Sequence, residues 1–179
     1  MTEYFDVINE KDEVVGKATR EECHKKGLLH RAVHIILVSK KGQILLQKRS
    51  MKKDLYKGWW IDAAAGHVDS GESCEQAASR EVKEELGLNV GKDVKMEELF
   101  KLRKKAAGKD YIDNEMITVY LVKSDGPFTV PKDEVEFVRF FDPKEVLKML
   151  KTEKFTPGTQ AVFEGLMKRP EHLKRLGLS

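Results

Sequence analysis

The stretch that decides the fold of this chain spans residues 66–88 and reads GHVDSGESCEQAASREVKEELGL. It starts as a polar loop with two glycines, and a helix is expected from near Glu72 onward. Four residues are spaced to form one apolar helix face that can pack on a core: Ala77, Ala78, Val82 and Leu86. Gly87 is expected to end the helix because glycine readily takes a positive φ, and Leu88 can then fold back on the last turn.

Three glutamates lie on the other face of this predicted helix. Glu81, Glu84 and Glu85 stand at positions i, i+3 and i+4, so their carboxylates converge within one turn. Mutual repulsion raises their pKa values, and a purely structural helix gains nothing from that. A divalent cation relieves the repulsion, because oxygen ligands are what Mg²⁺ and Mn²⁺ prefer. The alternative, a solvated and charged surface helix, does not explain the glycines and Arg80 of the same stretch.

The stretch also resembles the Nudix box, with no mismatch. The nine matching positions are Gly66, Glu72, Arg80, Glu81, Val82, Glu84, Glu85, Gly87 and Leu88. The resemblance implies a Nudix hydrolase, which cleaves a diphosphate linked to another moiety, and an α/β/α sandwich around a central mixed sheet. It implies that the three glutamates bind the metal, together with a carbonyl near Gly66. Arg80 would act with them at the catalytic site and pair with Glu72 to fix the loop against the helix.

Length and charge place residues 1–179 in one expected domain. The chain is long enough for one well-buried core and too short for two of ordinary size. The net charge of +3 is too small to argue for a nucleic-acid partner, and no apolar run approaches the length of a membrane span. Cys23 and Cys74 lack metal-ligand spacing, and residues 1–6 do not resemble a signal peptide, so the cytosol is the expected location.

Hydrophobic patterning predicts strands before and after the box helix. The expected strands are 4–8, 14–18, 30–38, 44–47, 59–65, 94–102, 115–122 and 135–141, and the other expected helices are 20–26, 143–150 and about 156–167. The first two strands form an N-terminal hairpin. Residues 103–110 are expected to be a charged loop, and residues 168–175 a basic tail. This order predicts an α/β fold with a mixed sheet between helical layers.

A second resemblance extends from about His24 to Glu115. The segments HRAVH (30–34), LLQKR (45–49), GWW (58–60) and AGH (65–67) resemble the isopentenyl-diphosphate isomerase branch of the same superfamily. The resemblance implies that Arg49 and Lys53 bind the substrate diphosphate. It also implies a metal site built from residues near His24, His30, His67, Asp113 and Glu115, with His24 displaced by one position.

This chain departs from that branch in two ways, and both departures favour hydrolysis over isomerisation. The isomerase cysteine should immediately precede Gly66, but this chain has Ala65 there, and an alanine cannot transfer a proton. The isomerases also lose box acids at the positions of Glu81 and Glu84. An isomerase-like enzyme is therefore kept only as an alternative.

The histidines also have a purely structural interpretation. Lone histidines near apolar strands are more often hydrogen-bonded structural residues than ligands, so a second metal site at His24, His30 and His67 stays open. His34 shares a strand face with His30, but nothing else marks it, and no chemical role is expected for it.

The predicted function is a hydrolase that depends on Mg²⁺ or Mn²⁺ and cleaves a diphosphate linkage in a nucleoside diphosphate derivative or a related compound. Glu81 and Glu115 are both candidates for the general base, and the sequence does not choose between them. The predicted substrate contacts are Arg49, Lys53 and Trp60, with packing as the alternative for the tryptophan.

A non-catalytic nucleotide-binding domain is the remaining alternative, disfavoured because the full acidic set is retained. The expected partner is a small-molecule diphosphate rather than a nucleic acid or a membrane, and a homodimer is compatible with this. The residues of the Nudix box do not identify the substrate, because loops outside the box build the pocket.

Overall fold

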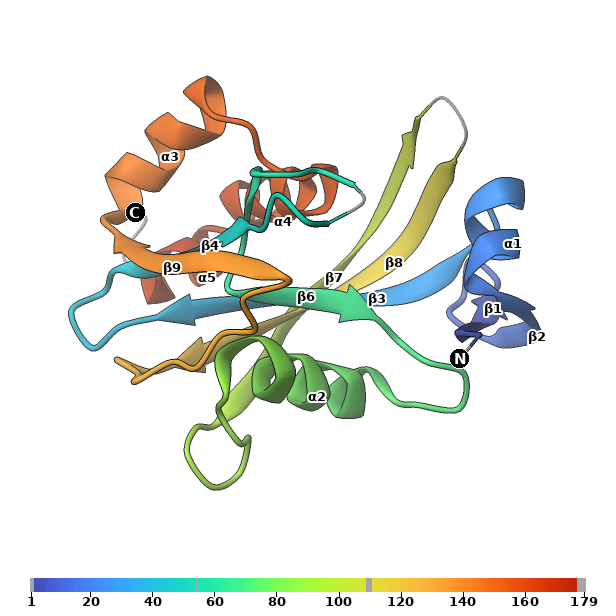
Figure 1. Ribbon diagram of the computed structural model, residues 1–179, viewed down its shortest axis with the longest axis horizontal. Coiled ribbons are helices and arrows are strands. Elements are labelled where there is room, and N and C mark those ends of the chain that lie inside the picture. Colours follow the sequence, from blue (N-terminus) through green and yellow to red (C-terminus); the bar gives the residue numbers. More distant parts are fainter. Residues whose placement is uncertain (1, 54, 109–110, 177–179) are drawn as a thin grey trace.

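The computed structural model describes residues 2–53, 55–108 and 111–176. In chain order its elements are β1 (Tyr4–Ile8), β2 (Val14–Thr19), α1 (Arg20–Lys26), β3 (His30–Val38), β4 (Ile44–Arg49), β5 (Trp60–Ile61), β6 (Ala64–His67), α2 (Cys74–Leu86), β7 (Met96–Ala107), β8 (Ile112–Lys123), β9 (Val135–Phe141), α3 (Pro143–Thr152), α4 (Pro157–Met167) and α5 (Pro170–Arg175) (Figure 1). Within these ranges, no helix is long and apolar enough to cross a membrane.

β3 is the central strand of a mixed sheet. It runs parallel to β8 and antiparallel to β4 and β6. β7 lies beyond β8, and β4 pairs in turn with β5 and β9. β1 and β2 form the separate N-terminal hairpin that the sequence predicts. Nearly all of β3 is buried, because its neighbours and the helices cover both of its faces, and this accounts for its continuous apolar run.

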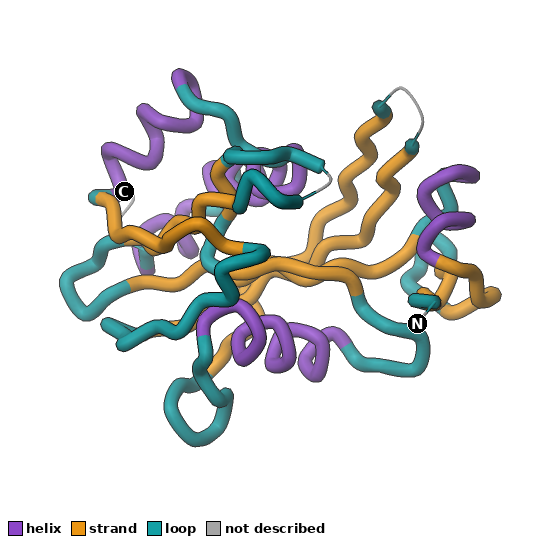
Figure 2. The backbone as a smooth tube through the Cα atoms, viewed as in Figure 1, coloured by secondary structure: helices purple, strands orange, loops and turns teal. Residues whose placement is uncertain are grey.

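Helices cover both faces of the sheet, which gives the predicted α/β/α sandwich (Figures 1 and 2). α2 packs on one face, where Val82 and Leu86 are fully buried. α3 and α4 pack on the other face, where Val146 and Phe163 join a second core. The predicted apolar face of the box helix is therefore the face that α2 presents to the sheet.

Alternation along β3 decides which residues reach which side. Ile35 belongs to the core under α2, and Ile36 belongs to the core under α4. Because side chains alternate along a strand, His30, Ala32 and His34 all point to the α4 side. α4 covers the part of that face around Ile36, and a pocket is lined by Ala32 and His34.

The caps of α2 follow from its sequence. The helix begins at Cys74 rather than near Glu72, because Ser73 forms a capping box with Gln76: each side chain accepts a hydrogen bond from the other residue's backbone amide, at 3.2 and 2.9 Å. The helix ends at Leu86, where Gly87 takes a φ of 72° as predicted.

Three expected elements are corrected. Residues 59–65 contain two short strands rather than one, because the chain pairs first with β4 through β5 and then crosses to β3 through β6. Much of the expected loop at 103–110 is strand, since β7 stays paired with β8 as far as Ala107; residues 109–110 lie outside the described ranges. The expected basic tail contains the short helix α5.

Candidate active site

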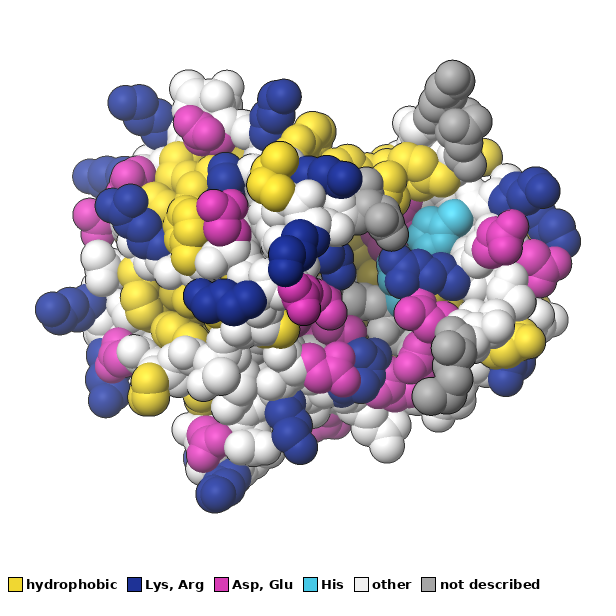
Figure 3. All heavy atoms as spheres, viewed as in Figure 1, with side chains coloured by type: hydrophobic (Ala, Val, Ile, Leu, Met, Phe, Trp, Pro, Cys, Tyr) yellow, Lys and Arg dark blue, Asp and Glu magenta, His cyan; other side chains and the backbone are white. Residues whose placement is uncertain are grey.

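A pocket of about 610 Å³ contains most of the residues that the sequence singles out. It is lined by α1, α2, β6, β8, residues 49, 53, 55 and 56, and the first turn of α4. Figure 3 shows the hollow, with acidic, basic and histidine side chains gathered in it. The predicted residues that line it are His24, Arg49, Lys53, Gly66, His67, Arg80, Glu81, Glu84, Glu85, Asp113 and Glu115.

The three glutamates of α2 form one wall of this pocket. Glu81 and Glu85 are buried, whereas the side chain of Glu84 is 58% exposed. Burial raises the pKa of Glu81 to about 7 and that of Glu85 to about 8. Gly66 faces this wall: a Cβ at Gly66 would lie 2.0 Å from Glu81 Oε1, so only glycine leaves room for the carboxylate. Glu81 and Glu85 therefore ionise reluctantly until a cation binds.

Arg80 connects this wall to the loop before it. Its guanidinium binds Glu72 through Nε and Nη2, at 3.2 and 3.0 Å, and Nη2 also donates to the carbonyl of His67 at 3.0 Å. Nη1 donates to Glu81 Oε1 at 2.5 Å. The ion pair implied by the Nudix resemblance is present in this geometry, and the same side chain also orients a predicted metal ligand.

Arg49 and Lys53 lie at the pocket, but Trp60 does not. The Nε atom of Arg49 is buried and makes no hydrogen bond within the described part of the chain, which suits an anionic ligand. Lys53 pairs with Glu134 at 2.7 Å. Trp60, the third predicted substrate contact, lies instead in the core under α3 and α4, edge-on to Phe141, because β5 directs its indole to that face.

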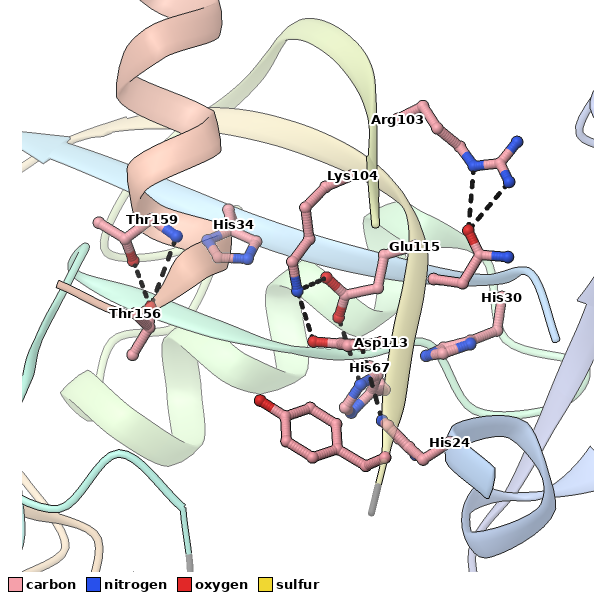
Figure 4. Close-up of polar contacts among 12 residues, drawn as sticks. His24, His30, His34, His67, Arg103, Lys104, Asp113, Glu115, Thr156 and Thr159 are labelled. Atoms are coloured by element: carbon pink, nitrogen blue, oxygen red, sulfur yellow. Dashed lines mark hydrogen bonds and ion pairs between the residues drawn. The ribbon is translucent and has the colours of Figure 1, made fainter. Parts of the chain in front are cut away.

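Three histidines and an aspartate converge on another side of the pocket (Figure 4). His24 comes from α1, His30 from β3, His67 from β6 and Asp113 from β8, and one ligand atom from each lies within 4.8 Å of the others. His30 Nε2, His67 Nε2 and Asp113 Oδ1 are buried without a hydrogen bond. Nδ1 of His24 and of His30 contacts a backbone carbonyl, at 2.7 and 2.9 Å, which leaves each Nε2 for the cluster. This donor set fits a divalent ion such as Mn²⁺ or Zn²⁺.

Glu115 lies beside this histidine cluster and is held by Lys104. Lys104 Nζ lies 3.1 Å from Glu115 Oε2 and 2.5 Å from Asp113. Burial alone would raise the pKa of Glu115, but His67 and Lys104 hold it well below its usual range. The carboxylate is therefore ionised although it is buried.

Ala65 lies where the isomerase branch has its cysteine. It lines the pocket from β6, directly opposite His34 in the pairing of β6 with β3. Its methyl group supplies neither a proton nor a ligand atom, so the pocket has no thiol at this point.

Several residues of the pocket are not predicted from the sequence. Lys104 lies in β7, paired with Glu115, whereas the sequence predicts a loop there. Glu134 precedes β9, and nothing in its local sequence marks it. Tyr56 and Tyr111 come from two separate loops, and their hydroxyls are hydrogen-bonded to each other. These residues meet only through the tertiary fold, so no local motif signals them.

Comparison with known proteins defines the class. Residues 28–161 match the NUDIX domain family. The chain is 38% identical over 160 residues to Nudix hydrolase 3 of Arabidopsis thaliana, covering 84% of this chain but only 21% of that protein. It is 32% identical over 172 residues to the uncharacterized Nudix hydrolase YfcD of Escherichia coli K12, covering 94% of this chain and 88% of that one. The chain thus spans about a fifth of the plant relative and most of the bacterial one.

Solved structures agree on the fold. DR0079 from Deinococcus radiodurans superposes with a TM-score of 0.75 at 23% identity, over 89% of this chain and 96% of that one. A MutT NUDIX hydrolase from Burkholderia pseudomallei gives 0.59 at 25% identity, over 76% and 96%. The NUDIX domain of Shewanella oneidensis NrtR, complexed with ADP ribose, gives 0.58 at 18% identity, over 79% and 87%. The predicted α/β Nudix fold is confirmed.

The chain belongs to the Nudix hydrolase family. With its fold and its relatives, this makes it a Nudix pyrophosphohydrolase.

Proposed function

We propose that the protein is a metal-dependent hydrolase that cleaves a diphosphate linkage in a nucleoside diphosphate derivative or a related small molecule. The observation that carries this proposal is the wall of Glu81, Glu84 and Glu85, which lies in one pocket with the unpaired Nε of Arg49. A diphosphate requires such a combination, because its anionic oxygens repel a nucleophile until their charge is neutralised.

The α2 wall would hold Mg²⁺ or Mn²⁺ through the three glutamates and the Gly66 carbonyl. When bound, the ion supplies charge neutralisation and a more acidic water. Arg80 orients Glu81 by donating to Oε1, and no described residue donates a hydrogen bond to Oε2. Arg49 and Lys53 would bind the oxygens of the diphosphate.

Glu81, rather than Glu115, is the proposed general base. Glu115 Oε2 accepts from Lys104 at 3.1 Å, and its Oε1 lies 3.4 Å from His67, so both oxygens face cationic or donor groups. Glu81 has one oxygen that no described residue engages. Glu81 would take the proton of the attacking water there, while Glu115 would remain ionised against Lys104.

The histidine cluster is proposed as a second cation site. The support is the convergence of four ligand atoms, of which His30 Nε2 and Asp113 Oδ1 are buried without a hydrogen bond, while His67 Nε2 lies 3.4 Å from Glu115 Oε1. Because these residues lie apart from the glutamates in sequence and come from other elements, we treat this site as separate from the α2 wall.

The isomerase-like alternative is opposed by Ala65, which has no proton to transfer at the position of the isomerase cysteine. The non-catalytic alternative is opposed by the complete acidic wall. ADP ribose, which is bound by the NrtR domain, belongs among the compounds to be tested.

A phosphate-release screen tests the proposal. The panel contains nucleoside diphosphate derivatives, ADP ribose and isopentenyl diphosphate, each with Mg²⁺, with Mn²⁺ and with a chelator. Cleavage of at least one nucleoside diphosphate derivative that stops when the metal is chelated is the expected result. If folded protein binds members of the panel with either metal but cleaves none, the binding-domain alternative is correct.

The proposal also includes a cytosolic location and one domain over residues 1–179. The free cysteines Cys23 and Cys74 support a reducing compartment. A homodimer is compatible with the pocket, and light scattering on the purified protein would measure the oligomeric state.

A further inference from the structure

β4 presents one buried amide to the box helix. Leu45 and Gln47 lie on the face of β4 that is turned toward α2, because side chains alternate along a strand and Leu46 joins the core on the other face. Leu45 belongs to the core under α2, whereas Gln47 is polar and only 1% exposed. A buried amide is costly unless it is hydrogen-bonded, so Gln47 requires polar partners at the edge of this core.

The amide of Gln47 connects Glu85 to the backbone of the sheet. The neighbouring acceptors are the Ala63 carbonyl and Glu85 Oε2, so the amide nitrogen, which has two hydrogens, is the atom that faces them. Nε2 donates to Ala63 O at 2.9 Å and to Glu85 Oε2 at 3.3 Å. Ala63 is itself fixed, since its backbone amide donates to the Ile35 carbonyl of β3 at 3.1 Å. The Glu85 carboxylate is thus held from the sheet as well as from α2.

The partner of Glu85 is neutral, unlike the partners of the other buried glutamates of the pocket. Glu81 pairs with Arg80 at 2.5 Å, and Glu115 pairs with Lys104 at 3.1 Å. Within the described ranges, no Lys or Arg forms an ion pair with Glu85, and the amide of Gln47 is the side-chain donor that reaches it. A neutral donor fixes the direction of a carboxylate without neutralising its charge. The negative charge of Glu85 is therefore left for a cation in the pocket.

We propose that Gln47 is a positioning residue for the metal site of the α2 wall: its amide holds Glu85 Oε2 and keeps the carboxylate in place as a charged ligand. This inference rests on the proposed function, since the metal is the one that the hydrolase would use. It adds to that site a residue of β4, outside the Nudix box. Arg49, two positions further along β4, is the proposed diphosphate contact, so one strand serves both the metal and the substrate.

The test is a calorimetric titration of the metal-free protein with Mg²⁺, without substrate. Gln47→Met removes the donor and keeps an unbranched side chain of similar length, and it should raise the Kd for Mg²⁺ at least about tenfold, as the loss of a residue that orients a metal ligand typically does. Gln160→Met is the matched control, because Gln160 also donates to a glutamate, Glu164, at 3.3 Å, but does not line the pocket. Its Kd should equal that of the unmodified protein.

A double-mutant cycle shows whether Gln47 acts through Glu85. Glu85→Gln alone should weaken Mg²⁺ binding, and adding Gln47→Met should raise the Kd by less than about twofold more, because the carboxylate that the amide holds is already gone. A purely structural role of Gln47 would instead lower the affinity by the same factor in both backgrounds. Thermal unfolding of each metal-free variant shows whether it is folded. If Gln47→Met does not fold, Gln47→Asn replaces it, since it keeps the amide on a side chain too short to span both acceptors, and its Kd should also rise.

The proposal is overturned if the variant at Gln47 binds Mg²⁺ as tightly as the unmodified protein, or if its effect is equally large in the Glu85→Gln background. Either result would leave the hydrolase proposal intact. If the unmodified protein binds no Mg²⁺, this inference and the metal site proposed at the α2 wall are both wrong. Because turnover is not measured, a failure to find hydrolysis would alter none of these results.

Discussion

The glutamates of α2 line the same pocket as His24 and His67 of the histidine cluster, yet the two groups are assembled in opposite ways. Glu81, Glu84 and Glu85 come from a single helical turn, so their convergence follows from a local spacing. The histidine cluster takes one residue from each of α1, β3, β6 and β8. Its convergence depends on the strand order of the whole sheet. The first group can be recognised in a linear sequence, and the second requires the fold or a family resemblance.

The two groups also differ in how burial affects their ability to bind a metal. Burial raises the pKa of Glu81 and Glu85, and it lowers the pKa of His30 to about 4 and that of His24 below its ordinary value. Burial therefore drives both groups toward their neutral forms. For a carboxyl group the neutral form is the protonated one, which cannot bind a metal, whereas a neutral imidazole can. Near neutral pH, metal binding should release protons from Glu81 and Glu85 but not from His24 and His30.

The largest expected effect comes from the α2 wall. Glu84→Gln should lower turnover by at least about 10², because it removes a charged ligand while it keeps the side-chain volume. Glu84 is largely exposed, so the fold should be retained. Glu75→Gln is the matched control, being the same change at an exposed position of the same helix that does not line the pocket. Steady-state kinetics with saturating Mg²⁺ would reject the ligand assignment if both variants kept full activity.

Arg80→Ala should have the next-largest effect. It should lower both the stability of the fold and the turnover rate. It leaves Glu72 and Glu81 without their cation beside an acidic wall, which should cost about 2 kcal/mol of unfolding free energy and lower the rate by about tenfold or more. Thermal unfolding and kinetics on one preparation measure the two effects. Lost activity with an unchanged melting temperature would indicate that Arg80 contacts the substrate instead.

A substitution in the histidine cluster should weaken the binding of a transition metal and leave the binding of Mg²⁺ unchanged. His30→Gln should weaken binding of Mn²⁺ or Zn²⁺ by at least about tenfold at one of two sites, because it removes one of four ligand atoms. The Mg²⁺ supported by the α2 wall should be retained. Calorimetric titration of both proteins, with His172→Gln as the control outside the pocket, makes the measurement. An unmodified protein with no transition-metal site of this kind would show that the cluster is structural.

The smallest expected effect is a pH dependence of stability in the metal-free protein. The pKa values of Glu81 and Glu85, about 7 and 8, lie above the ordinary value, so the folded state binds protons more tightly than the unfolded state. Their stabilising contribution is complete at low pH and is lost as the pH rises through 7 and 8. The melting temperature should fall by about 5 °C or more between pH 5 and pH 9. Mg²⁺ should restore more stability at pH 9 than at pH 5; equal effects at both values would contradict the assignment.

The sequence alone predicts the α2 region well, because its signals are local. The apolar spacing of Val82 and Leu86 and the stop at Gly87 each act within a few residues, and the structure has them as expected. The sequence predicts the helix start near Glu72 rather than at Cys74, because the capping residue, Ser73, is only one of several polar residues there. The end of β7 is harder to predict. Phe100 and Leu102 alternate with charged residues, but this alternation breaks at Lys104, although the strand stays paired with β8 as far as Ala107.

The side chains that the sequence could not assign depend on pairings between distant segments. Trp60 was expected at the substrate, but whether a strand residue faces the pocket or the core is decided by which strand it joins. The surroundings of His34 could not be predicted either, because its partner Asp62 lies 28 positions further along the chain and its neighbour Gly158 opens a distant helix. No periodicity within β3 carries that information.

Product analysis of the unmodified protein by ³¹P NMR tests the central claim most directly. The enzyme is incubated with Mg²⁺ and, in separate samples, with isopentenyl diphosphate and with the nucleoside diphosphate derivatives that respond in the screen. The account predicts that a nucleoside diphosphate derivative is cleaved at its diphosphate linkage, that a chelator stops this, and that isopentenyl diphosphate gives no allylic isomer because Ala65 offers no proton. Accumulation of an allylic diphosphate above background, with the nucleoside derivatives left intact, would contradict it.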